Sequence, residues 1–341
     1  MPNFIPTIHP WNQEVWQNLT MEPERSNHAL LFNGDSGLGK ADIAFALAHF
    51  VLTDNHAQSE SLFNAGSHPD LHIVMPENAL GDDLPSQFAQ RYLESHSGKP
   101  KRAITIEQIR RLSQALTTHP HISKHRVIVI YQAETMNRNA SNALLKSLEE
   151  PPANTLFIIV TDELSKLVKT IRSRCSLVNF RAPDPQSAKA WLGLQKVIPD
   201  AELDTYLAMA NNHPLRAIEL FQNDYLSSLK AVFTDVNGLW MRKSEVTQVA
   251  KNWQGIGGFE VIDVLQKLTS DLLKTHLSDT VSDVFFPVQQ AWVASSSRKL
   301  SKVKLVALID ELNYAKKMLA TTVDELLVLE SVSNKIRVLP A

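Results

Sequence analysis

The sequence has little of what several protein classes require. Among its 341 residues Cys175 is the single cysteine, which excludes an internal disulfide framework and a zinc site built from several cysteines. Its apolar stretches fall well short of the roughly 20 residues that a helix needs to cross a bilayer. The first residues lack the basic run and apolar stretch of a signal peptide. We therefore expect a cytoplasmic protein with no membrane segment.

An excess of either charge is also lacking. The chain has 34 Lys and Arg against 36 Asp and Glu, a formal net charge of −2, so no strong overall field attracts nucleic acid. The sequence does not predict a protein that binds DNA by charge alone, although this balance leaves room for a basic local face. The length suits two or three domains of about 100–200 residues each.

The first half of the chain alternates strand and helix signals. Four short runs are rich in Leu, Ile and Val, and they lie at residues 29–32, 71–74, 126–130 and 156–160. A helical pattern covers 41–51. Near-continuous apolar runs separated by helices indicate a parallel sheet buried on both faces, which predicts a right-handed doubly wound α/β domain. The polar stretch at 77–101 is expected to lie outside the core.

After residues 181–185 the pattern becomes helical. Residues 186–223 are typical of short helices, and the remainder is helical, including the stretch 302–332. Apolar residues recur there at a spacing of three to four; they are Val306, Ile309, Leu312, Ala315, Leu319, Val323 and Leu326. This spacing predicts one apolar stripe, which fits either the core of a helical domain or an oligomer interface.

The segment GDSGLGKA after the first strand matches a phosphate-binding loop with one position altered. Gly34, Gly37 and Gly39 allow backbone N–H groups to converge on phosphate, and Lys40 would reach the β- and γ-phosphates. The Ser or Thr whose hydroxyl holds Mg²⁺ is replaced by Ala41. P-loop ancestry is the favoured interpretation, and a tight turn that merely joins strand to helix stays open for present activity.

The strand that should carry the Walker B carboxylates lacks them. Residues 127–130 run into Tyr131 and Gln132, where an active ATPase of this type has Asp-Glu. Tyr131 cannot orient a metal, and Gln132 is a poor proton acceptor. Glu134 lies two residues further on, but its use would require the strand to continue through Tyr131 and Gln132.

Two metal-holding groups and a catalytic base are therefore missing at three separate places. Phosphoryl transfer depends on positioning and charge neutralisation, so this loss removes most of what the protein contributes. We expect no ATP hydrolysis by this chain alone, no required cofactor and no metal site. Binding of ATP or ADP by the loop is expected to be weak or absent.

Three further segments carry a more specific pattern. They are ITIEQIR at 104–110, NALLKSLEEPP at 142–152 and TIRSRC at 170–175. The second predicts a helix that Asn137 or Asn139 caps, that Pro151 ends, and whose buried face holds Ala140, Leu144 and Leu148. In this order behind the phosphate loop, the three segments resemble the bacterial AAA+ clamp-loader subunits of DNA polymerase III, over roughly residues 1–225.

Within that family, altered Walker positions beside an intact Ser173-Arg174-Cys175 resemble the delta-prime type rather than the tau/gamma motor. The resemblance implies an α/β AAA+ P-loop domain at 1–182, with a parallel sheet flanked by helices. It also implies a small helical lid domain at 183–224 and an all-α collar domain for oligomerisation at 225–341.

The resemblance further implies a non-hydrolysing structural subunit, a stator, of the replicative clamp loader. Such a subunit contacts tau/gamma and delta, helps to load the β sliding clamp on primed DNA, and meets DNA through the complex. Arg174 would act in trans on the γ-phosphate of ATP held by a neighbouring tau/gamma subunit, because a forked, permanently charged guanidinium suits phosphoryl oxygens. Any DNA-directed DNA polymerase label would come from membership of the complex alone.

Two other functions stay open. One is an active tau/gamma-like AAA+ ATPase motor, against which Ala41, Tyr131 and Gln132 all argue. The other is a nucleotide-sensing scaffold that uses the loop glycines and Lys40 without hydrolysis. For Arg174 itself, the alternative role is a structural surface ion pair.

Other family positions have plainer interpretations. Thr161 takes the place of the first sensor and Arg216 resembles the second, but both are as readily structural in a chain that has lost its hydrolysis site. Many relatives insert a four-cysteine zinc module after the P-loop helix, whereas residues 41–70 contain no cysteine, so no zinc is expected. Cys175 is expected to be a small buried residue beside Arg174.

Overall fold

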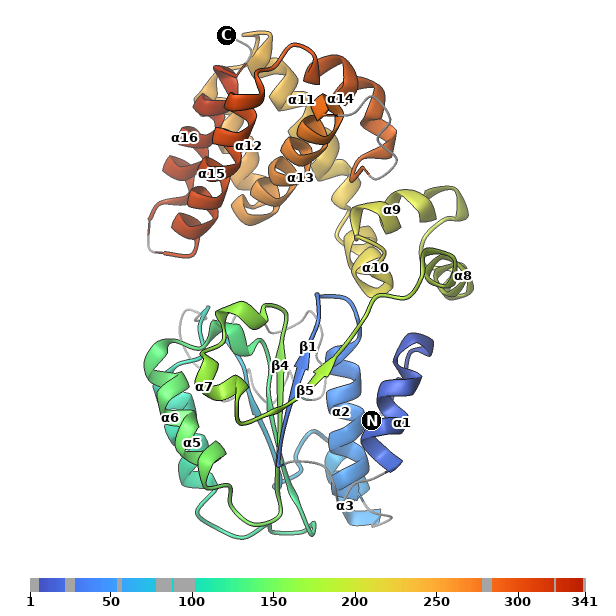
Figure 1. Ribbon diagram of the computed structural model, residues 1–341, viewed down its shortest axis with the longest axis vertical. Coiled ribbons are helices and arrows are strands. Elements are labelled where there is room, and N and C mark those ends of the chain that lie inside the picture. Colours follow the sequence, from blue (N-terminus) through green and yellow to red (C-terminus); the bar gives the residue numbers. More distant parts are fainter. Residues whose placement is uncertain are drawn as a thin grey trace. The chain divides into compact units, whose positions relative to one another are not determined.

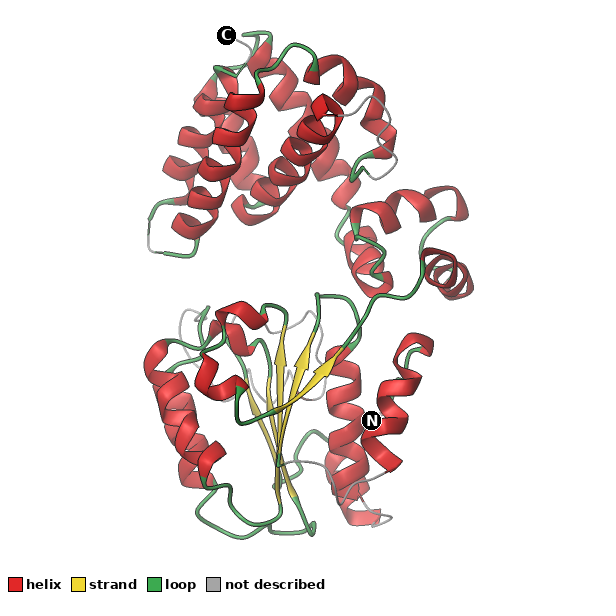
Figure 2. Ribbon diagram, viewed as in Figure 1, coloured by secondary structure: helices red, strands yellow, loops and turns green. Residues whose placement is uncertain are grey.

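The computed structural model describes residues 6–21, 28–53, 57–77, 88, 102–277, 284–321 and 323–339. The chain divides into two compact units, Met1–Ala182 and Pro183–Ala341 (Figure 1). The described strands all lie in the first unit, and the second unit is helical (Figure 2). Of the stretch 77–101, Glu77 and Phe88 alone fall within the described residues, so our expectation for it concerns residues outside them.

Within the described residues, five strands form one sheet in the spatial order β2-β3-β4-β1-β5. They are β1 (Ala29–Asn33), β2 (Leu71–Val74), β3 (Arg126–Ile130), β4 (Thr155–Thr161) and β5 (Ser176–Asn179). All four strand pairs are parallel, which confirms the predicted α/β fold. Because β1 lies between β4 and β5, the segments that follow these three strands meet at one edge of the sheet.

Helices cover both faces of the sheet, because side chains alternate along each strand. Leu30 and Phe32 face one hydrophobic cluster, whereas Ala29 and Leu31 face the other. The first cluster is covered by α1 (Gln13–Met21), α2 (Lys40–Thr53) and α3 (Ala57–Asn64), and the second by α5 (Ile106–Ala115), α6 (Arg138–Glu149) and α7 (Lys169–Arg172) (Figure 1).

Strand β5 was not predicted. The run at 156–160 was expected to be the last strand, but β5 follows directly after Cys175. Its residues alternate between partly buried and exposed, and Leu177 is 48% exposed. A short edge strand with half of its side chains in solvent lacks the continuous apolar run that identified the other four.

The caps of α5 and α6 are local and specific. Asn137 caps α6 by accepting a hydrogen bond from the Ala140 N–H at 2.8 Å, which decides between the two predicted capping residues. Helix α5 begins with a capping box in which Thr105 and Gln108 bond each other's backbone N–H groups. These caps satisfy N–H groups that a helix start leaves unpaired.

The second unit is built from α8 (Pro185–Gln195), α9 (Leu203–Met209), α10 (Pro214–Gln222), α11 (Tyr225–Trp240), α12 (Val246–Ile256), α13 (Gly258–Leu277), α14 (Gln290–Ser297), α15 (Lys302–Leu319) and α16 (Glu325–Arg337). Buried residues between Ala188 and Leu339 form one hydrophobic cluster. The division of the second unit into a lid at 183–224 and a collar at 225–341 stays a prediction. Among the described residues, no helix combines the length and apolar character that crossing a membrane requires.

The stripe predicted over 302–332 is interrupted. Helix α15 ends at Leu319, and α16 begins at Glu325 because the Asp324 carboxylate accepts a hydrogen bond from the Leu326 N–H. Val306 and Val323, both assigned to the stripe, are 48% and 45% exposed. A local cap starts a second helix here although the apolar spacing continues through the turn.

Candidate functional site

The candidate phosphate loop lies between β1 and α2, as the sequence predicted. Gly37 and Gly39 both have a φ of 79°, a left-handed conformation that side chains other than glycine seldom adopt. Gly34 lies directly after β1, where a Cβ would be 2.8 Å from the Phe180 carbonyl oxygen. The glycines that suit phosphate binding are therefore also needed to build this turn.

Lys40 is paired inside the first unit. Its side chain is 4% exposed, and its Nζ lies 2.7 Å from Oδ1 of Asp162, the residue that follows β4. Nζ also donates a hydrogen bond to the Asp35 carbonyl oxygen at 2.6 Å. The sequence motif predicted the position of Lys40 but gave no sign of its partner.

A segment near the amino terminus packs against the loop. The sequence did not predict this contact. Trp11 Nε1 and Asn12 Nδ2 both donate to the Leu38 carbonyl oxygen, at 3.0 and 2.8 Å. His9 Nε2 lies 2.8 Å from Asp42 Oδ2, and its ring stacks on Trp11 with 4.8 Å between centroids. The available signal was the sequence His-Pro-Trp-Asn, in which Pro10 starts a short 3-10 helix.

The end of β3 departs from the arrangement needed for Walker B chemistry. The strand ends at Ile130, Tyr131 is buried, and Gln132 takes a left-handed φ of 51°. The strand therefore does not continue through Tyr131 and Gln132. Glu134 nevertheless reaches the end of β4 through this turn, where its Oε2 accepts a hydrogen bond from the Asp162 N–H at 3.4 Å.

The environment of Glu134 favours the protonated acid. Burial is the main reason that the pKa of this carboxyl group is raised, and the negative charge of Asp162 adds to the effect. A hydrogen bond from the Thr161 side chain acts in the opposite direction. Thr161 is fully buried, and its hydroxyl also accepts a hydrogen bond from the Glu163 N–H, so it holds the turn after β4.

A phosphate loop of this kind implies a nucleotide with Mg²⁺, and the residues present do not fit that pair. Ala41 offers a buried methyl group where a metal-binding hydroxyl is needed, and Lys40 is already paired with Asp162. In the part of the chain that the structure describes, no group of three or more His, Cys, Asp or Glu side chains could hold a metal ion.

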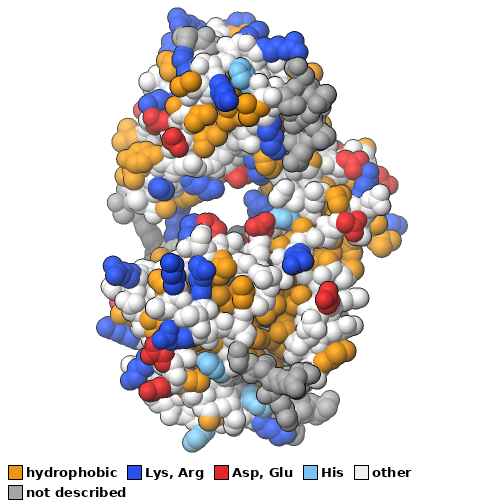
Figure 3. Space-filling model, in the orientation of Figure 1, with side chains coloured by type: hydrophobic (Ala, Val, Ile, Leu, Met, Phe, Trp, Pro, Cys, Tyr) orange, Lys and Arg blue, Asp and Glu red, His pale blue; other side chains and the backbone are white. Residues whose placement is uncertain are grey.

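Arg174 lies on the surface between α7 and β5. Its Nη1 donates to the Thr170 carbonyl oxygen at 2.9 Å, and its Nη2 lies 2.5 Å from Oε1 of Glu149, the last residue of α6. The side chain is 33% exposed. Lys and Arg side chains gather over this face of the first unit (Figure 3), and Lys169 and Arg172 lie on the same short helix as Thr170.

Cys175 follows Arg174 and is half-buried. Burial raises the pKa of its thiol to about 11, so the thiol stays protonated and unreactive at neutral pH. In the second unit, Arg216 on α10 forms an ion pair with Glu219 one turn later. Arg216 also interacts electrostatically with Asp263 and Tyr225 on neighbouring helices, so its charge is used within the second unit.

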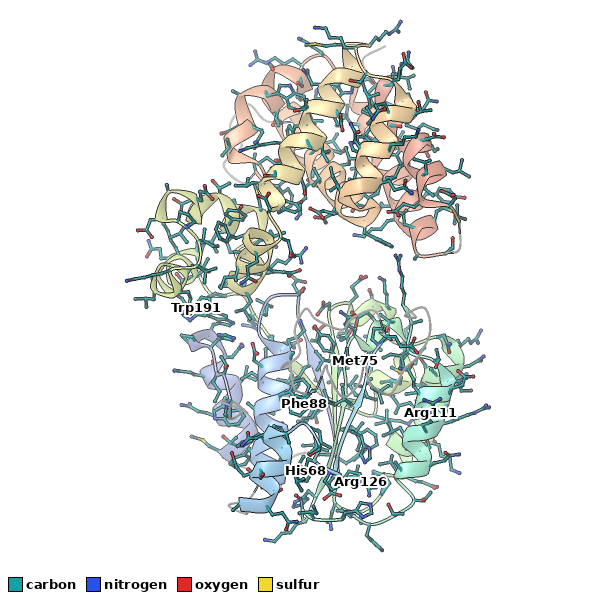
Figure 4. All side chains as sticks on the ribbon, turned by 180° about the vertical axis from the view of Figure 1, so that it is seen from behind. His68, Met75, Phe88, Arg111, Arg126 and Trp191 are labelled. Carbon is teal, nitrogen blue, oxygen red and sulfur yellow. The ribbon has the colours of Figure 1, made fainter. Side chains whose placement is uncertain are left out.

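His68 and Asp70 belong to a buried network at the amino end of the sheet, where His68 lies close to Arg126 (Figure 4). His68 Nδ1 accepts from the Asp70 N–H at 3.1 Å, and Nε2 lies 2.7 Å from Ser59 Oγ. Burial lowers the pKa of His68. The Asp70 carboxylate accepts backbone N–H bonds from His121, Ile122 and Ser123. Burial would raise the pKa of Asp70, but these bonds outweigh it and hold that pKa below its ordinary value.

Comparison with known proteins gives a consistent result. Residues 11–184 match a family model described as DNA polymerase III, delta subunit. The chain is 30% identical over 232 residues to DNA polymerase III subunit delta' of Haemophilus influenzae, covering 65% of this chain and 64% of that one, which is somewhat less than two thirds of the relative's length. The Pseudomonas aeruginosa subunit delta' is 29% identical over 260 residues, covering 73% of this chain and 72% of the relative.

Among solved structures, the chain resembles a DNA polymerase III gamma subunit-related protein from Thermotoga maritima, at 18% identity and a TM-score of 0.48, over 96% of this chain and 99% of that one. The family model covers just over half of the chain, and the phosphate loop and Ser173-Arg174-Cys175 lie within the matched range. The chain therefore belongs to the DNA polymerase III delta-subunit family, and the curated relatives described above are delta-prime subunits.

Proposed function

We propose that this chain is a delta-prime-type stator of the clamp loader of DNA polymerase III. It does not hydrolyse ATP itself, and it lends Arg174 to an ATP site on a neighbouring tau/gamma subunit. The contrast between two cations carries the proposal. Lys40 is 4% exposed and paired within its own unit, whereas Arg174 is 33% exposed on an outer face.

The contacts of Arg174 suit this role. A guanidinium has five N–H donors, and the bonds to Thr170 and Glu149 orient the fork while leaving donors for phosphoryl oxygens. The pair with Glu149 is partly exposed, and such pairs contribute only about 0–1 kcal/mol, so a phosphate can displace the carboxylate. The Lys and Arg side chains gathered on this face favour the approach of an anion.

The proposed partners follow from the family. The chain would assemble with tau/gamma and delta in the cytoplasm, act on the β sliding clamp through the assembly, and meet DNA within the complex. A polymerase activity would belong to the complex. The altered phosphate loop and the Tyr131-Gln132 pair that follows β3 support a subunit that takes no part in hydrolysis in cis.

ATP turnover by a reconstituted loader tests the role of Arg174. In a loader with Arg174→Ala, we expect phosphoryl transfer at the neighbouring site to slow by about 10³–10⁵-fold, the usual effect of losing an arginine finger. Steady-state ATPase with primed DNA and clamp measures the resulting fall. The matched control is Arg172→Ala, which removes an exposed positive charge two residues away and should leave turnover unchanged.

Equal DNA-stimulated turnover in the Arg174→Ala loader and the unaltered loader would contradict the proposal. The isolated chain gives the baseline, which we expect to be free of Mg²⁺-dependent ATPase activity. Robust turnover by the chain alone that disappears in Lys40→Ala would instead favour the motor function.

A further inference from the structure

We propose that Asp162 is a built-in anion of the phosphate loop: its carboxylate neutralises Lys40 and thereby keeps polyphosphate out. This inference rests on the proposed function in one respect, namely that the chain does not use its own loop for hydrolysis. It gives a second reason why the loop would not bind nucleotide. That reason is the side chain of Asp162, which is separate from the altered Walker positions and can be replaced by mutation.

The fold delivers this carboxylate to the loop. Strands β1 and β4 pair in a register that sets Asn33 opposite Thr161. Asp162 therefore lies just beyond the end of β4, beside the start of the loop that follows β1. Its Oδ1 is 2.7 Å from Lys40 Nζ, which is the geometry of a charge-assisted hydrogen bond.

The lysine has little left to offer a phosphate. An ammonium group has three donors, and the Asp162 carboxylate and the Asp35 carbonyl oxygen take two of them. The side chain is 4% exposed, so a phosphate could bind Lys40 only by displacing the carboxylate. The displaced carboxylate would then repel the phosphate that replaced it.

Surrounding groups hold this arrangement. The Asp162 N–H donates to Glu134, which fixes the backbone behind the carboxylate. On the other side, the bonds from Trp11 and Asn12 to the Leu38 carbonyl oxygen hold the loop, and a Cβ at Gly39 would lie 2.6 Å from His9 Cδ2. The loop therefore cannot change shape to free Lys40 without moving this segment.

The local charge balance also opposes a polyanion. Residues 34–42 contain two aspartates and a single lysine, and Asp162 adds a further carboxylate beside that lysine. A site that binds a di- or triphosphate needs an excess of positive charge. Removal of the Asp162 charge should therefore convert the loop into an anion site served by Lys40.

Isothermal titration of the full chain tests this inference, with ADP and, separately, inorganic pyrophosphate, both without Mg²⁺. We expect Asp162→Asn to bind both ligands at least tenfold more tightly than the unaltered chain. Glu163→Gln is the matched control, because it removes the same charge from the adjacent residue, whose carboxylate is exposed and pairs with Lys166. The double variant Asp162→Asn/Lys40→Ala should lose the gain.

Equal affinity of Asp162→Asn and Glu163→Gln would overturn the inference, as would a gain that persists without Lys40. Thermal unfolding verifies that each variant is folded, and Asp162→Ser provides a second, smaller replacement that removes the same charge. The titration needs no partner subunit. A failure here is therefore separate from a failure of the Arg174 experiment, which measures turnover at a neighbour's site.

Discussion

At the scale of single residues, His68 serves the fold through its protonation state. Its Nδ1 accepts a hydrogen bond from the Asp70 N–H, so the neutral ring carries its proton on Nε2, which faces Ser59 Oγ. A second proton on Nδ1 would set two N–H groups against each other in a buried space. In its neutral form His68 is therefore a structural lock.

This lock predicts a pH dependence of stability. Burial lowers the pKa of His68 in the folded chain below its ordinary value of 6.5, so the unfolded chain takes up a proton at higher pH than the folded chain. The stabilisation is fully present above about pH 6.5 and declines as the pH falls toward the folded pKa. Urea unfolding from about pH 8 to pH 5 measures this slope, which should be smaller in His68→Gln. Identical slopes for the two proteins would refute the assignment.

The sequence was a good guide to where the site residues lie and a poor guide to what they contact. The phosphate loop is a local motif, so its place between β1 and α2 followed from residues 29–51 alone. The partner of Lys40 did not, because Asp162 is more than a hundred residues away and reaches Lys40 only through the pairing of β1 with β4. The same holds for the contacts that His9 and Trp11 make with α2 and the loop.

At the scale of secondary-structure elements, burial decided which elements could be predicted. Three strands inside the sheet, β1, β3 and β4, are almost uniformly buried, and β2 at one edge still has buried residues at both ends, whereas β5 at the other edge has none and was missed. The turn between α15 and α16 was missed for a different reason. Apolar spacing continues through it, and no glycine or proline marks the end of α15.

The start of α6 gives a direct test at this scale. Asn137→Ala should lower the free energy of unfolding by about 1 kcal/mol, because the Ala140 N–H loses its acceptor. Asn139→Ala is the matched control, since Asn139 is exposed within the first turn and should have little effect. Chemical denaturation of the two variants measures both values. A larger loss in Asn139→Ala would show that the cap is assigned to the wrong residue.

At the scale of the whole molecule, the second unit leaves apolar side chains uncovered. Tyr314 on α15 and Leu327 on α16 are 61% and 62% exposed, and both lie in the predicted collar. The two side chains line one hollow between α15 and α16, and contiguous exposed apolar surface of this kind is found at protein interfaces. The predicted stripe thus contributes one set of residues to the core, while Tyr314 and Leu327 beside it stay exposed.

Assembly with partners tests this surface. We expect the full chain to co-elute with tau/gamma and delta in gel filtration, and Leu327→Asp to weaken that association at least tenfold, because it places a charge in an apolar contact. Leu277→Asp is the matched control, since Leu277 is 65% exposed at the end of α13. Failure of the unaltered chain to bind either partner would count against the clamp-loader assignment itself.

The stretch from Asp162 to Cys175 joins β4 to β5, and both strands pair with β1. One end of that stretch holds Lys40, and the other presents Arg174. Taken together, the two proposals mean that no nucleotide enters or leaves the phosphate loop of this chain. Nucleotide exchange therefore cannot shift the segment from Asp162 to Cys175. The guanidinium would then keep one pose through every cycle of its neighbours and give a moving assembly its fixed point of reference.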